Sequence, residues 1–197
     1  VILGYNAGNG TYNDIDGDVL IGAMTGSNIT GTQNTIVGFE GGKKAGSNNS
    51  LFGYNTGTNL TGDYNTILGS NSGKEIKSNY NIVIGDESLT STEINTDGNI
   101  VIGSQACNKL TSGGNVYIGY KSGINNDGEN NTIIGDGALS FTTDISTKNN
   151  TIIGKDAGKN FKGDQNLIIG SAAGSGSVEV KNIIKNNILL GYNAGKL

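Results

Sequence analysis

The stretch Asn130–Leu139 reads NNTIIGDGAL, and the stretch Asn149–Gly158 reads NNTIIGKDAG. Each copy places two large apolar residues side by side, directly before a glycine. Neighbouring side chains of a β-strand point to opposite faces, so the two isoleucines of each copy face different surroundings. The sequence therefore predicts a repeated strand with two apolar faces, and the second face needs a cover.

The same unit runs along the whole chain, as the glycines that close the apolar runs show. These glycines recur at spacings of 15 to 21 residues. We take each one as position 0 of its repeat and number the other positions from it. Positions −2 and −1 are always apolar in character, position +3 is always small, and position +4 is mainly glycine. The anchor glycines are Gly4, Gly22, Gly38, Gly53, Gly69, Gly85, Gly103, Gly119, Gly135, Gly154, Gly170 and Gly191.

A repeat of about sixteen residues fits one coil of a β-solenoid, with a strand, a tight corner and a return. Ile, Val and Thr suit the strand, and the glycines suit the corners. We predict an all-β fold, a parallel β-solenoid or β-roll of about twelve coils, forming a single domain over residues 1–197. Coils about 4.8 Å apart would make a rod of about 58 Å.

Two columns of the repeat receive a structural assignment. The residues at position −1 are predicted as the repeat core: Ile21, Val37, Phe52, Leu68, Ile84, Ile102, Ile118, Ile134, Ile153, Ile169 and Leu190. The residues at position −4 are predicted to stack as an amide ladder: Asn34, Asn49, Asn65, Asn81, Asn99, Asn115, Asn131, Asn150, Asn166 and Asn187.

A solenoid has one inside, so only one of the two apolar columns can fill the coil. The other column would form a continuous apolar stripe, larger than soluble monomers normally expose. We expect partner chains to cover it in a closed homotrimer, either intertwined or side by side. The alternative is a wider coil that buries both columns within one chain.

Composition excludes several functional classes. Histidine is absent, which removes the commonest general base and metal ligand. The net charge is −4 and arginine does not occur, so there is no basic footprint for a nucleic acid. Apolar runs are too short for membrane insertion. We expect no catalytic residue, no cofactor and no metal ion.

The repeat resembles known fibre proteins. The segments NTIVGFEGG (34–42), NTILGSNSG (65–73), NTIIGDGAL (131–139), NTIIGKDAG (150–158) and ILLGYNAG (188–195) resemble Asn-Thr-x-x-Gly-x-x-Ala-Gly repeats of phage and viral fibres. They are also similar to the head repeats of YadA-like trimeric autotransporter adhesins. That resemblance implies a left-handed β-roll, a trimer with a shared apolar axis, and a role in adhesion. The adhesin unit is shorter and more even than this one.

Several acidic side chains and the thiol of Cys107 are candidates for a metal-binding or reactive site. Asp14, Asp16 and Asp18 alternate as in a calcium loop, but the later Gly and distal Glu of that loop are missing. The segments NTDGN (95–99) and NNDGEN (125–130) are typical of turns, and calcium binding by Asp97 or Asp127 is the alternative. Cys107 replaces the usual glycine of position +4, which indicates a packing residue.

Two further hypotheses remain open, a catalytic pair of carboxylates and an ice-binding threonine column. Asp136 and Asp156 lie in adjacent repeats, and Asp86 shares the column of Asp136; a carboxylate pair would suit a polysaccharide-cleaving fibre. A threonine column at position −3 would suit ice binding, but Ile82, Ile100, Val116 and Leu167 interrupt it. That column contains Thr35, Thr66, Thr132 and Thr151.

The sequence therefore favours a structural shaft or head of an extracellular fibre on a cell or virion surface, with possible attachment to a host glycan or protein. A depolymerase-type fibre, a self-assembling filament subunit and an ice-binding solenoid are the alternatives. The first and last repeats, VILGYNAG and ILLGYNAG, are nearly the same and lack a polar cap. We expect either a segment of a longer fibre or end-to-end stacking of rods.

Overall fold

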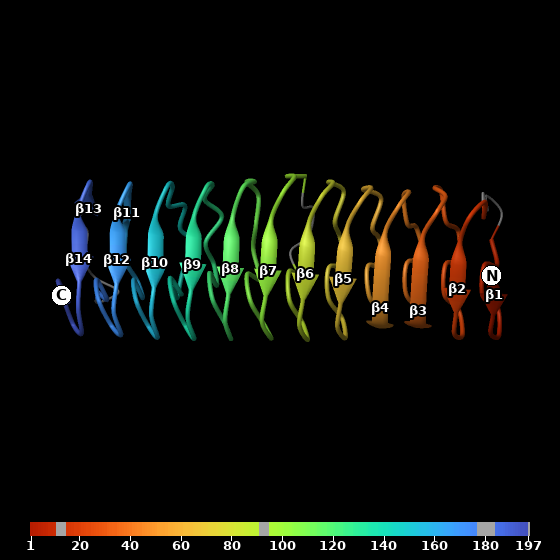
Figure 1. Ribbon diagram of the computed structural model, residues 1–197, viewed down its shortest axis with the longest axis horizontal. Helices are drawn as coiled ribbons and strands as arrows, with labels where there is room; N and C mark the ends of the chain where they lie inside the picture. Colours follow the sequence, from red (N-terminus) through yellow and green to blue (C-terminus); the bar gives the residue numbers. More distant parts are fainter. Residues whose placement is uncertain (11–14, 91–94, 177–183, 197) are drawn as a thin grey trace.

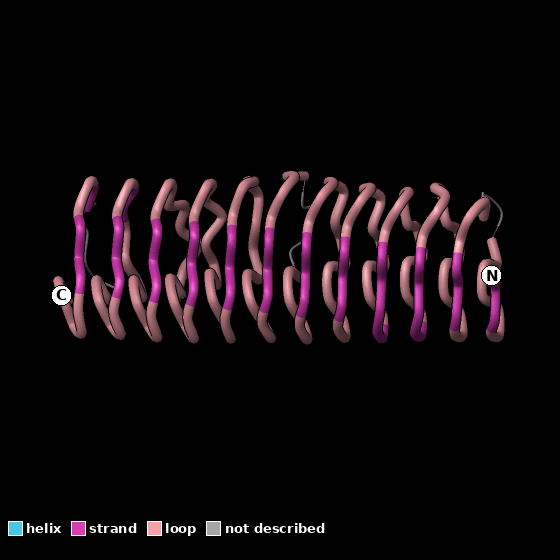
Figure 2. The backbone as a smooth tube through the Cα atoms, in the orientation of Figure 1, coloured by secondary structure: helices cyan, strands magenta, loops and turns pink. Residues whose placement is uncertain are grey.

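The computed structural model describes residues 1–10, 15–90, 95–176 and 184–196. The chain winds into a straight rod of stacked coils, with one continuous sheet along one side (Figures 1 and 2). Twelve strands form this sheet, and they follow one another in chain order. Two further short strands pair with each other in a separate sheet. The main strands are β1 (Ile2–Leu3), β2 (Val19–Ile21), β3 (Thr35–Phe39), β4 (Ser50–Tyr54), β5 (Thr66–Leu68), β6 (Ile82–Ile84), β7 (Ile100–Ile102), β8 (Val116–Ile118), β9 (Thr132–Ile134), β10 (Thr151–Ile153), β12 (Leu167–Ile169) and β14 (Ile188–Leu190).

Every pair of neighbouring strands is parallel, and its register follows the repeat. Ile133 of β9 lies opposite Ile152 of β10, and Ile134 lies opposite Ile153. Every strand of the main sheet covers positions −3 to −1, except β1, which begins at position −2; the β-branched residues concentrate at these positions. The parallel β-solenoid predicted from the sequence is confirmed, since equal positions of successive repeats stack into columns.

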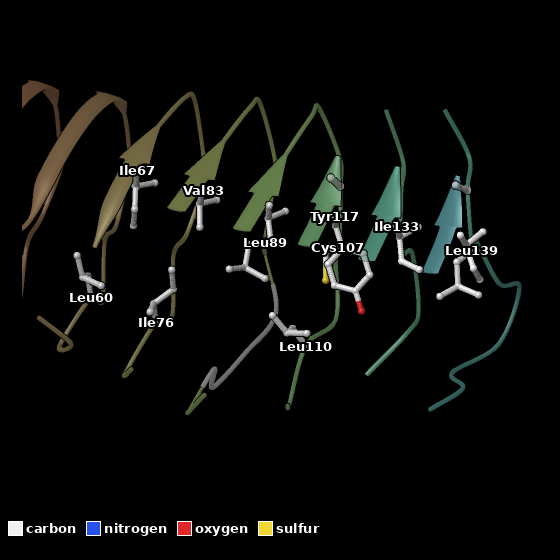
Figure 3. Close-up of a cluster of buried hydrophobic side chains, with 14 of the residues drawn as sticks. Leu60, Ile67, Ile76, Val83, Leu89, Cys107, Leu110, Tyr117, Ile133 and Leu139 are labelled. Atoms are coloured by element: carbon white, nitrogen blue, oxygen red, sulfur yellow. The ribbon is translucent and has the colours of Figure 1, made fainter. Parts of the chain in front are cut away.

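The core of the rod is the column at position −2. Its residues from Leu20 to Ile168 are fully buried. Figure 3 shows Ile67 and Val83 pointing from their strands into the coil, where Leu60 and Ile76 meet them from the opposite wall, and Ile133 pointing inward further along the rod. The complete column comprises the exposed Ile2 of the first coil, then Leu20, Ile36, Leu51, Ile67, Val83, Val101, Tyr117, Ile133, Ile152, Ile168 and the partly buried Leu189.

The position −1 column, which the sequence analysis assigned to the repeat core, lies outside the coil. Ile134 is half-buried, and the exposed fraction of Leu68 is 47%. The reason is the alternation of the strand: position −2 points inward, so positions −3 and −1 both point outward. The coil is too thin to hold both apolar columns, and the wider single-chain coil is therefore not what forms.

The anchor glycines are required by the corners that end the strands. Gly103 has φ of +143°, a backbone region that only glycine adopts readily. A Cβ atom there would also lie 2.3 Å from the backbone oxygen of Gly119 in the next coil. The same clash with the next anchor recurs from Gly4 to Gly170, which explains why no repeat has another residue at position 0.

The return side of the coil is mostly irregular. Strands β11 (Gly163–Asp164) and β13 (Ile184–Lys185) form a two-stranded parallel sheet there, and Asn126 forms an isolated bridge with Ile145. Within the described residues there is no helix that is long and apolar enough to cross a membrane.

Candidate interaction surface

The outer face of the sheet is an apolar surface without a partner in the single chain. We define the outer face as positions −3 and −1 of the twelve coils whose strands form the main sheet, β1 to β10, β12 and β14. None of these positions carries a charged residue. Its most exposed side chains lie at the two ends, where the exposed fractions of Val1, Ile188, Leu3 and Leu190 are 78%, 70%, 66% and 61%. Leu68 is exposed to 47% in the middle of the rod.

The outer face is long enough to matter energetically. Twelve strands about 4.8 Å apart, each about three residues wide, give a stripe of roughly 58 by 10 Å, or about 600 Å² in projection. The largest apolar patch on a typical soluble monomer reaches about 300–600 Å² and is often functional. The stripe therefore lies at the upper limit of what a monomer exposes.

The asparagine column holds the N-terminal edge of the outer face in register. The side-chain oxygen of Asn49 accepts hydrogen bonds from the backbone N–H and side-chain amide of Asn65, at 2.8 and 3.2 Å. The Asn65 amide also donates to the backbone oxygen of Ser78, at 2.9 Å. The same pattern repeats up to Asn187, so the predicted column forms a continuous buried ladder.

A second side-chain ladder runs along position −6, and sequence reasoning missed it. The backbone N–H of Ser47 donates to a carboxylate oxygen of Asp63 at 2.6 Å, and the N–H of Asp63 donates to Asn79 at 2.8 Å. Asn79 donates in turn to Asp97 at 2.7 Å. Here the earlier coil donates to the later one, opposite to the asparagine ladder. The residue types at position −6 vary. The one signal in the sequence that could have identified this column is that each of these side chains carries an oxygen that can accept a hydrogen bond.

Stacked aromatic pairs flank the outer face on both sides. Phe39 and Tyr54, at position +1, stack with ring centroids 5.7 Å apart. Tyr64 and Tyr80, at position −5, stack at 5.1 Å. Each pair spans two adjacent coils, and all four rings are exposed. Exposed aromatic rings beside an apolar stripe are typical of protein interfaces.

The acidic candidates form no metal site in the described residues. Asp18 is buried and begins the asparagine ladder, because its carboxylate accepts the N–H of Asn34 at 2.6 Å. Asp16 is exposed, and Asp14 lies outside the described residues. Across the parts of the chain that the structure describes, no group of three His, Cys, Asp or Glu residues could hold a metal ion.

The carboxylates weighed for catalysis lie at the surface. Asp136 is 3.9 Å from the ammonium of Lys155, and Asp156 is 3.4 Å from that of Lys159. Asp86 is exposed three coils away. The threonines of position −3 lie on the outer face, interrupted by aliphatic residues as the sequence indicates.

Cys107 is fully buried beside Tyr117 in the core (Figure 3). Its thiol donates a weak hydrogen bond to the backbone oxygen of Lys109 at 3.5 Å. Burial raises the pKa of the thiol well above its ordinary value, so the thiolate that nucleophilic chemistry needs does not form at neutral pH. Cys107 is a packing residue.

Tyr117 is the one aromatic residue in the inner column, and its hydroxyl is satisfied inside the coil. The side-chain amide of Asn126 donates to it at 2.8 Å. The Asn126 oxygen accepts from the backbone N–H and the hydroxyl of Thr147, both at 3.2 Å. Burial raises the pKa of Tyr117, so the phenol stays protonated.

Comparison of the chain with protein-family models, with curated proteins and with solved structures finds no match.

Proposed function

We propose that the chain is a structural shaft or head segment of a fibre on the surface of a cell or virion, and that it acts as a homotrimer. Three rods lie parallel around one axis and bury their outer faces against each other. The fibre serves to hold shape and to present its remaining surface for attachment.

The uncharged, apolar outer face is the observation that carries this proposal. A standard protein interface needs about 800 Å² from each partner. The stripe supplies about 600 Å², which a cyclic trimer divides between two neighbouring chains, and the flanking aromatic pairs extend it on both sides. Because each repeat contributes the same positions, parallel rods in a cyclic arrangement match like residues at every level of the axis.

The construction of the rod suits a mechanical role. Backbone hydrogen bonds and two side-chain ladders run along the axis, and the apolar core is continuous from coil to coil. Two of the three carboxylates considered for catalysis, Asp136 and Asp156, lie beside lysines at the surface.

The solution mass tests the proposal. Light scattering after size exclusion is expected to give about three times the chain mass of 20.2 kDa. The double variant Leu68→Lys with Ile134→Lys would place six ammonium groups, two from each chain, near the shared axis. It is expected to run as a monomer with an unchanged circular dichroism spectrum. Thr61→Lys, at an exposed position away from the outer face, is the matched control and is expected to stay trimeric. A folded wild-type monomer, or an open-ended series of masses, would contradict the shared axis.

A further inference from the structure

A polar groove runs along the rod past the corner that follows the strands, away from the outer face. It crosses the coils of β5 to β8 and has a volume of about 370 Å³. One wall is formed at position +2 by Asn71, Glu87 and Gln105. The other wall is formed at position +5 by Lys74, Thr90, Asn108 and Ile124.

The groove exists because the residues between the two walls turn inward. Ser72, Gly73, Ser88 and Leu89, at positions +3 and +4, are buried. The floor is therefore backbone, without a side chain that projects into the groove. The anchor glycine and the left-handed backbone of position +2, with φ of 53° at Asn71, set this direction.

Three coils outside the groove close the same gap, whereas in the described residues no hydrogen bond or ion pair joins Asn71 to Lys74 or Glu87 to Thr90. In the coil of β3, Lys43 at position +5 pairs with Glu40 at position +2, at 2.8 Å. In the coil of β4, the hydroxyl of Thr58 donates to Asn55 at 2.7 Å. In the coil of β10, Lys159 pairs with Asp156 in the same way.

Within the groove the wall side chains bond along the rod instead of across it. The Asn55 amide donates to Asn71 at 3.0 Å, and the Gln105 amide donates to a carboxylate oxygen of Glu87 at 3.0 Å. Among the described residues, no carboxylate lies within ion-pair distance of Lys74. The wall at position +2 is thus held by bonds along the rod, and Asn108 of the other wall exchanges hydrogen bonds with Asn125, also along the rod.

The polar atoms of the walls indicate the class of ligand. Amides and a hydroxyl offer donors and acceptors together, and one ammonium balances one carboxylate. The backbone of the floor is already paired between coils, as in Gly73 N–H to Ser88 oxygen at 3.1 Å and Leu89 N–H to Ala106 oxygen at 3.0 Å. An extended peptide would therefore find no unpaired strand edge to join.

We propose that this groove binds an unbranched, neutral oligosaccharide laid parallel to the rod axis. Sugar hydroxyls would exchange hydrogen bonds with both walls, and Ile124 would contact the C–H face of a sugar ring at one end. The wall residues recur with the coil spacing of about 4.8 Å, which is close to the length that one pyranose unit adds to an extended chain. This inference deepens the attachment role and rests on the proposed function for its biological use.

The test uses the wild-type chain and a panel of neutral, acidic and basic linear oligosaccharides, with binding measured by calorimetry and by NMR titration. We expect binding to neutral members only, with affinity that rises with length up to about four units, one for each coil of the groove. No binding of any neutral oligosaccharide, or preference for charged ones, would overturn the proposal.

Two variants copy the closed coils into the groove. Asn71→Glu can pair with Lys74, and Thr90→Lys can pair with Glu87, both in the arrangement of Glu40 and Lys43. The double variant is expected to fold normally and to bind the oligosaccharide at least about tenfold more weakly, the loss that one or two hydrogen bonds account for. Ala172→Glu with Ser175→Lys builds the same pair in the coil of β12, outside the groove, and is expected to bind like the wild type.

These variants leave the outer face untouched, so the two proposals fail separately. If the chain is a trimer and still binds the oligosaccharide after the groove is closed, only the proposal that the groove is the binding site is overturned. A monomer that binds oligosaccharides in a closure-sensitive way overturns only the shared axis.

Discussion

The side-chain oxygen of Asn65 accepts two hydrogen bonds from Asn81 in the next coil, at 2.9 Å from the backbone N–H and 3.0 Å from the side-chain amide. Asn81 accepts the same two bonds from Asn99. One buried side chain thus satisfies polar groups of two coils and fixes their axial register. This explains why position −4 is so uniform although it lies beside apolar columns.

Replacing a central ladder residue is expected to be costly. Asn81→Ala removes the side-chain amide that donates to Asn65 and the side-chain oxygen that accepts from Asn99, while the backbone N–H to Asn65 remains, and it leaves buried polar groups unpaired. We expect a loss of about 3 kcal/mol in the free energy of unfolding, measured by urea denaturation. Asn187→Ala is the control, because Asn187 lies in the last coil and is only partly buried; about 1 kcal/mol is expected there. Equal losses at the two sites would contradict a ladder that acts on both neighbours.

The anchor glycines give a second matched pair. Gly103→Ala adds a methyl group that overlaps the backbone of Gly119 and also forces alanine into an unfavourable φ. At Gly191, φ is +118° but no atom lies within 4 Å of the added Cβ. We expect Gly103→Ala to destabilise the chain by more than about 3 kcal/mol and Gly191→Ala by about 1–3 kcal/mol, the cost of the strained backbone alone. Thermal unfolding of both variants, with soluble yield as a second readout, would separate the two effects.

The adjacent isoleucines of the repeated stretch have different environments, and their truncation is expected to have different consequences. Ile133→Ala leaves a cavity in the sealed coil and should cost about 2–5 kcal/mol at any protein concentration. Ile134→Ala, on the outer face, should cost less than about 1.5 kcal/mol in a monomer, because the side chain is only partly buried there. In the proposed trimer it should also make the melting temperature depend more steeply on concentration. Melting curves over a hundredfold dilution range measure this, and identical concentration dependence in the two variants would argue against burial of Ile134 between chains.

The buried thiol predicts a loss of stability at alkaline pH. The pKa of Cys107 is raised in the folded chain, whereas an unfolded thiol has a pKa of about 8.5. The folded state therefore holds a proton that the unfolded state releases, so stability is fully present below pH of about 8.5 and falls above it.

The slope should approach about 1.4 kcal/mol per pH unit for this one proton. Urea midpoints between pH 7 and 10 measure it. Cys107→Ala should flatten the profile up to pH of about 10, where Tyr117 begins to contribute in the same direction. An unchanged pH profile in Cys107→Ala would show that the thiol is not the group responsible.

The architecture could be predicted from the sequence because nearly every copy of the repeat carries the same pattern. The period, the paired apolar positions and the asparagine column each recur in nearly every copy, so the parallel solenoid and the ladder follow from pattern alone. Which of the two apolar columns turns inward does not follow, since Ile133 and Ile134 are chemically identical. That choice depends on the corner at the anchor glycine, which sets the rotation of the strand about its axis.

The groove could not be predicted for a different reason. Its walls are formed by positions +2 and +5, where residue types vary from coil to coil. What distinguishes the groove is the direction in which Asn71 and Gln105 form hydrogen bonds, along the rod and not across it. Side-chain directions of this kind depend on neighbouring coils, and a single repeat does not contain that information.

The hydrogen bond between Tyr117 and Asn126 offers a last prediction, because both residues replace aliphatic side chains of the core. Tyr117→Phe removes the acceptor of the Asn126 amide at a fully buried site, and is expected to cost about 1–3 kcal/mol. In the background of Asn126→Ala the same change should cost at least about 1 kcal/mol less, since the amide is already gone. Asn126→Ala alone should be the more damaging single change, because Thr147 also loses its acceptor. A double-mutant cycle by urea denaturation measures the coupling, and costs that add within about 0.5 kcal/mol would show that the two side chains do not stabilise the coil as a pair.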